Sequence, residues 1–126
     1  MRTLTTVTII IVLLFGGSFA SYRYIQTSAQ HLSSQLETVE TSITTQKWDA
    51  AQNQLQTAQQ RWDQTKTWWT VLLDHQEIDN IDISMKRLEK YIATQGSSLS
   101  LGELSALQLL VEHISDTEKL NLRNIF

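Results

Sequence analysis

The sequence predicts an all-α protein, with an N-terminal transmembrane helix that continues into an antiparallel helical bundle of about four helices. In four successive stretches, apolar residues recur at alternating intervals of three and four, which is the spacing of one helix face. The chain has no proline, the strongest helix breaker, and only short polar segments separate the four stretches. About one hundred residues follow the apolar head, which suits a single domain.

The first element is a segment from Leu4 to Tyr22 that contains no charged side chain. As a helix, its 19 residues span about 28 Å, close to the ~30 Å hydrocarbon core of a bilayer. Arg2 precedes the segment, which favours a cytoplasmic N-terminus and a single pass through the cell membrane. We therefore expect residues 1–22 to be a membrane anchor and residues 23–126 to form one extracytoplasmic helical domain.

A cleavable signal peptide is the alternative interpretation of this segment. Arg2 supplies the basic start, and Ser18 and Ala20 are small residues at the positions that a signal peptidase recognises. Cleavage after Ala20 would release a secreted body. We favour a retained anchor because the apolar periodicity continues without a break beyond that position.

The first two helices are expected over residues 4–44 and 46–73, each with a stripe of heptad-like spacing. The second stripe includes three tryptophans, with Trp68 beside it. Because Ala51 and Ala58 alternate with these large side chains, packing against a neighbouring helix is favoured over a ligand groove. The stripes comprise Tyr22, Ile25, Ala29, Leu32, Leu36, Val39 and Ile43, and then Trp48, Ala51, Leu55, Ala58, Trp62, Thr65, Trp69 and Leu72.

Two capping boxes predict where the remaining helices begin. Asp74, with Glu77 three residues later, starts a helix over residues 75–94, and Asp74 is expected to accept from the backbone amide of Glu77. The same pattern at Ser100 starts the last helix, over residues 101–119. No strand is expected.

Several short motifs in the second half of the chain resemble those of one uncharacterised family. They are HQEIDNI at residues 75–81, the pair Arg87-Leu88, EHI at 112–114 and the ending EKLNLRNIF at 118–126. In order and spacing, these motifs resemble domain of unknown function 4363, a family of small membrane-anchored helical proteins of Gram-positive spore formers. The resemblance covers nearly the whole chain. It implies a membrane-anchored helical protein, and it assigns no activity and no catalytic residue.

One constellation has the residue types of a metal site. His75, Asp79 and Asp82 share an edge of the third predicted helix, where imidazole and carboxylates can hold a divalent metal. Capping of the first turn and an ion pair between Asp82 and Lys86 explain the same residues without a metal. The chain also lacks cysteine, a glycine-rich phosphate loop and an HExxH motif. We therefore expect no metal, no cofactor and no catalytic residue.

The body of the chain is acidic. Residues 31–126 carry 8 basic and 13 acidic side chains, which gives them a net charge of −5. Nucleic-acid binding needs Lys and Arg to neutralise phosphates, so this balance argues against a nucleic-acid partner.

The predicted function is that of a non-enzymatic, membrane-anchored interaction module that supports another envelope protein, with self-association as a further option. Exposed parts of the heptad stripes would form the contact by helix-in-groove packing. The expected interaction residues are Trp68, Trp69, Ile125 and Phe126. The alternative is a metal- or ligand-binding envelope protein that uses the edge formed by His75, Asp79 and Asp82.

Overall fold

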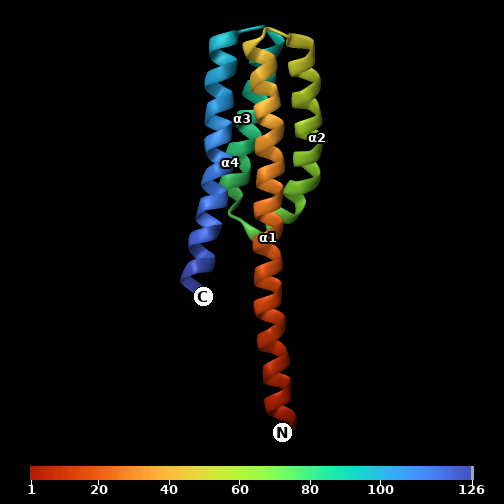
Figure 1. The fold of residues 1–126 in the computed structure, drawn as a ribbon, viewed down its shortest axis with the longest axis vertical. Helices are drawn as coiled ribbons and strands as arrows, with labels where there is room; N and C mark the ends of the chain where they lie inside the picture. Colours follow the sequence, from red (N-terminus) through yellow and green to blue (C-terminus); the bar gives the residue numbers. More distant parts are fainter. Residues whose placement is uncertain (126) are drawn as a thin grey trace.

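The computed structural model describes residues 1–125, which form four helices and no strand (Figure 1). Consecutive helices run in opposite directions. The first helix packs against the second and fourth, and the third likewise packs against the second and fourth. The predicted all-α helical bundle is therefore confirmed. The helices are α1 (Arg2–Thr44), α2 (Trp48–Leu72), α3 (His75–Ala93) and α4 (Ser97–Ile125).

Helix α1 has two halves with different surroundings. From Ser21 to Thr44 it lies within the bundle, whereas the residues before Ser21 are exposed and continue past the α2–α3 turn (Figure 1). Among the described residues, α1 is the one helix long and apolar enough to cross a membrane, and none of its most apolar 18-residue stretch is buried. The projecting half has the properties of a membrane anchor or of a signal sequence.

The core of the bundle is built from the predicted stripes. Ala51 and Ala58 are fully buried, and they separate large side chains along α2. The rings of Trp62 and Trp69 meet edge to face, with centroids 5.2 Å apart and planes at 88°. This geometry is favourable for aromatic pairs, and both side chains belong to the apolar core. The tryptophan stripe is therefore core, as the sequence predicted, and not a ligand groove.

Two of the connections between helices use the same local structure. After α1, Gln46 adopts a φ of 58°, and the backbone amide of Lys47 donates to the carbonyl of Ser42 at 2.8 Å. After α3, Gln95 adopts a φ of 57° in the same arrangement. A left-handed residue with this long backward hydrogen bond is the Schellman motif, which satisfies the last carbonyls of a helix. Both turns send the chain back beside the helix that it has just left.

The start of α4 differs from the sequence prediction. The capping box expected at Ser100 does not form, because the turn after Gln95 leads the chain into helix already at Ser97. The Ser100 amide donates to the Gly96 carbonyl at 2.9 Å as a helical residue. Its hydroxyl is buried and finds no partner among the described residues. The helix also continues to Ile125, beyond the predicted end, and is 29 residues long.

Asp74 caps α3 as predicted, but through a different amide. Its carboxylate accepts a hydrogen bond from the backbone amide of Gln76 at 3.2 Å, and not from that of Glu77. The Glu77 carboxylate instead lies 3.9 Å from Nε2 of His113 on α4. The cap thus depends on Asp74 alone, while Glu77 faces the neighbouring helix.

Candidate interaction groove

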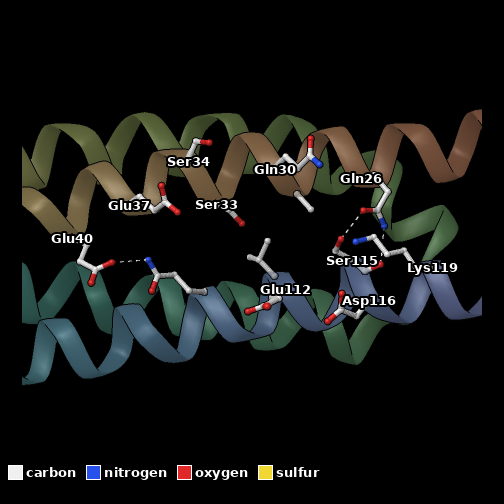
Figure 2. Close-up of a pocket in the computed structure, with 13 residues that line it drawn as sticks. Gln26, Gln30, Ser33, Ser34, Glu37, Glu40, Glu112, Ser115, Asp116 and Lys119 are labelled. Carbon is white, nitrogen blue, oxygen red and sulfur yellow. Dashed lines mark hydrogen bonds between the residues drawn. The ribbon is translucent and has the colours of Figure 1, made fainter.

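A polar groove runs between α1 and α4 and has a volume of about 790 Å³ (Figure 2). Its floor contains the buried side chains of Ala29 and Val111. Polar side chains line both walls, and every lining residue comes from these two helices. The walls comprise Gln26, Gln30, Ser33, Ser34, Glu37 and Glu40 of α1, and Gln108, Glu112, Ser115, Asp116 and Lys119 of α4.

Hydrogen bonds join the two walls at both ends of the groove, as the dashed lines in Figure 2 show. At one end, Nε2 of Gln26 donates to the Ser115 carbonyl at 2.7 Å, and the Ser115 hydroxyl donates back to Oε1 of Gln26 at 2.7 Å. At the other end, Nε2 of Gln108 donates to Oε2 of Glu40 at 3.1 Å. Because Gln26 is only 9% exposed, its reciprocal bonds satisfy a buried amide and fix the register of α1 against α4.

Between these two sets of hydrogen bonds, several polar side chains of the walls have no partner in the described part of the protein. The side chains of Gln30, Ser33 and Glu37 make no hydrogen bond or ion pair with any residue that the structure describes. Carboxylates outnumber cations along the described walls, so the groove attracts positive charge. The charged lining residues are Glu37, Glu40, Glu112, Asp116 and Lys119. This combination suits a cationic segment that can also exchange hydrogen bonds with the walls.

A comparison with protein families places the chain. The family described as "Domain of unknown function (DUF4363)" matches residues 19–125. The chain belongs to this family. The match starts two residues before α1 enters the bundle, and so it includes the bundle part of α1, the other three helices and both walls of the groove. The resemblance seen in the sequence motifs is confirmed, while no curated protein and no solved structure matches the chain significantly.

The predicted metal edge of this DUF4363 protein does not gather its three side chains around one point. His75 and Asp79 are exposed at the start of α3, whereas Asp82 turns toward α2. Among the residues that the structure describes, no three His, Cys, Asp or Glu side chains are placed to hold a metal ion. The edge therefore offers no preformed set of metal ligands.

Asp82 instead links α3 to α2. Its Oδ1 accepts a hydrogen bond from Nε1 of Trp62 at 2.7 Å, and its Oδ2 lies 3.5 Å from Nζ of Lys66. Partial burial lowers the pKa of Lys66, but the nearby carboxylates of Asp82 and Asp63 raise it to above its ordinary value. The predicted pairing of Asp82 with Lys86 is wrong, because packing against α2 brings Lys66 to this carboxylate.

The structure separates the predicted interaction residues. Trp69 is 0% exposed and belongs to the core, so a partner cannot touch it in the folded protein. Trp68, the next residue back, is 64% exposed. The side chain of Ile125 and the whole of Phe126 lie outside what the structure describes. The apolar members of the heptad stripes are also largely buried, so these stripes offer little apolar surface to a partner helix.

A smaller hollow of about 320 Å³ lies where the α2–α3 turn meets α4. The carboxyl groups of Asp74, Glu77 and Glu118 line it together with apolar side chains such as Leu73 and Ile114. Partial burial raises the pKa of Glu118, because desolvation disfavours the charged carboxylate. Protonation of Glu118 is therefore expected to be linked to folding of the bundle.

Sequence reasoning missed the α1–α4 groove, although the sequence holds a signal for it. Gln26, Ser33 and Glu40 follow the first stripe at intervals of seven, and Gln108 and Ser115 are also seven apart on α4. Polar residues at one fixed heptad position, beside the buried ones, line the edge of a helix–helix interface. The missing information was which helix lies across from α1 at this edge.

Proposed function

We propose that this DUF4363 protein is a non-enzymatic, membrane-anchored interaction module that holds a cationic segment of another envelope protein. The observation that carries the proposal is the α1–α4 groove of about 790 Å³, with its excess of carboxylates and its unpaired amide and hydroxyl groups. A Lys- or Arg-rich segment laid along the groove would bring its charges close to Glu37 and Glu112. Charge pairs in a partly desolvated groove are stronger than pairs on an open surface.

The apolar half of α1 supports an anchored arrangement. It leaves the bundle as an exposed helix long enough to cross a bilayer, and Arg2 precedes its uncharged segment. Positive charge at that end favours a cytoplasmic N-terminus, with the bundle outside the cell membrane. One continuous helix would then cross the bilayer and form one wall of the groove. Confinement to the membrane raises the effective concentration of the groove for a second membrane protein.

The groove has the chemistry of a binding surface more than that of a catalytic centre. Nucleophilic catalysis needs a hydroxyl or thiol held by a base that is itself oriented by a third group. Ser33 lies about one helical turn before Glu37 in the groove, but neither side chain has a partner among the described residues. Unpaired polar groups along the groove are suited to hydrogen bonds with complementary groups of a partner.

Site-specific photocrosslinking in native membranes tests this proposal. A benzophenone amino acid in place of Gln30, which lines the groove, should give one discrete adduct with a membrane protein. The same amino acid in place of Gln60, which is exposed on α2 and outside the groove, should give none. The combined changes Glu37→Gln and Glu112→Gln should weaken the Gln30 adduct. Equal adducts at the two positions would contradict the groove as the docking site, as would an adduct insensitive to these charge changes.

A further inference from the structure

We propose that the last turns of α2 form a second membrane contact, in which Trp68, Val71 and Leu72 lie in the interfacial layer of the bilayer. This inference rests on the retained anchor of the proposed function. It goes beyond that function because it assigns a lipid-binding surface to the bundle itself, separate from the groove.

The first observation is an exposed apolar face at the end of α2. Trp68 is 64% exposed, Val71 is 78% exposed and Leu72 is 39% exposed. Intervals of three and four residues make Trp68 a neighbour of both Val71 and Leu72 on the helix surface, with Leu72 at the edge next to the fully buried Trp69. Single exposed apolar residues are ordinary, whereas a tryptophan grouped with two aliphatic side chains indicates a contact surface.

The second observation is the height of this face along the bundle. Ser28 of α1 and Thr65 of α2 line the same small hollow, so they lie at a similar level. Because α1 and α2 are antiparallel, two helical turns from there bring α1 to Ser21 and α2 to Leu72. Ser21 is where α1 enters the bundle, at the edge of its uncharged segment. Figure 1 likewise shows the α2–α3 turn beside the point where α1 leaves the bundle.

A lipid surface is therefore the occupant that the geometry favours over a protein. The exposed face lies at the level where the apolar segment of α1 leaves the bundle, and tryptophan is enriched at the interface between hydrocarbon and headgroups. Arg23 and Arg123 are exposed near this end of the bundle, where they can meet lipid phosphates. Figure 1 shows that α4 also ends on this side, beyond the α2–α3 turn.

Acidic residues limit the extent of the contact. Asp74 and Glu77 lie at the start of α3, at the same end of the bundle, and carboxylates disfavour an anionic lipid surface. The apolar contact is therefore confined to the α2 side. We expect neutral phosphatidylcholine to support it without anionic lipid.

Quenching of tryptophan fluorescence by brominated lipid tests the inference. The full chain is reconstituted into vesicles of phosphatidylcholine brominated near the glycerol end of its acyl chains, and vesicle flotation measures insertion separately. The wild type should show a lipid-quenched component that Trp68→Phe largely removes. The matched control Trp48→Phe, at the opposite end of α2, should keep that component. Iodide in the aqueous phase should quench at least as large a fraction of the emission in Trp68→Phe as in the wild type, because the bilayer shields Trp68.

Two results would overturn the inference while the anchor stands. One is a lipid-quenched component of the same size in the wild type and in Trp68→Phe. The other is iodide quenching that falls when Trp68 is replaced, which would show that this side chain faces water in the floated protein. Protein that fails to float would overturn the anchor and, with it, the membrane contact. Photocrosslinking at the groove is independent of the first two outcomes, so failure of the α2 contact is distinguishable from failure of the docking proposal.

Discussion

The indole Nε1 of Trp62 on α2 donates a 2.7 Å hydrogen bond to Oδ1 of Asp82 on α3. Two turns further along α2, the indole Nε1 of Trp69 is also buried, but it has no hydrogen-bond partner among the described residues. The two tryptophans pack against each other in one core, yet only one of them ties α2 to α3 through a polar bond. This contrast gives a direct measure of how much that bond stabilises the bundle.

Trp62→Phe should destabilise the fold by about 1–2 kcal/mol more than Trp69→Phe. Both changes remove a similar volume from the core, so their cavity costs are comparable. Trp62→Phe also removes a donor from the Asp82 carboxylate, whereas Trp69→Phe removes a donor that has no partner. Urea unfolding of the full chain in mild detergent measures the difference. Equal losses of stability in the two variants would show that the bond is energetically unimportant.

Glu118 should make the bundle less stable as the pH rises. Burial raises the pKa of this carboxyl above its ordinary value of 4.5, so the folded state binds more protons than the unfolded state between the two pKa values. Protonation of Glu118 contributes fully to the free energy of unfolding below pH 4.5, and this contribution is lost as the pH rises through the raised pKa of the folded state. Glu118→Gln should therefore stabilise the protein at pH 7 and have less effect at acidic pH. Thermal unfolding measures the melting temperatures of the wild type and of Glu118→Gln across this pH range. A difference between them that does not change with pH would contradict the effect of burial.

Added Zn²⁺ should leave the melting temperature of the wild type unchanged. A metal that binds only the folded state would raise it by linkage. His75→Ala and Asp79→Ala should each change the stability by less than ~0.5 kcal/mol, because both side chains are exposed. Scanning calorimetry with and without the metal measures both effects. A reproducible rise that disappears in both variants would favour the metal-binding alternative.

The native protein should retain its N-terminal segment. Ser18 and Ala20 offer a site for signal peptidase, and cleavage after Ala20 would produce a chain that begins at Ser21. The helical bundle itself begins at Ser21, so cleavage would leave the bundle intact. Intact mass spectrometry of the native protein, purified from cells and medium together, separates the two cases. A mature chain that starts at Ser21 would contradict the retained anchor and show that the N-terminal segment is a cleaved signal peptide.

The sequence predicted those features of the fold that depend on neighbours along the chain. The stripe through Ile25, Leu36 and Ile43 is buried, because heptad spacing places those residues on one face of any long helix. The cap at Asp74 formed because a capping carboxylate needs only the first turn of its own helix. Such features are local, and periodicity determines them before any packing is known.

Features that depend on packing between helices were beyond the sequence. Asp82 pairs with Lys66, from another helix, in preference to Lys86, which lies four residues on in the same helix. The groove likewise depends on α1 lying beside α4, which the stripes alone do not specify. Ser100 has the pattern of a capping residue, but a left-handed residue at Gln95 starts the helix earlier. In each case a contact or backbone conformation outside the motif determined the outcome.

Copurification from native membranes tests most directly whether the groove holds a cationic partner. Tagged full-length protein should recover one membrane protein, and the double variant Glu37→Gln/Glu112→Gln should recover about tenfold less, as expected for the loss of two charge pairs. The matched control Asp49→Asn/Asp79→Asn removes the same charge from exposed positions outside the groove and should recover as much partner as the wild type. Equal recovery by the groove variant and the control variant would contradict the proposed docking site.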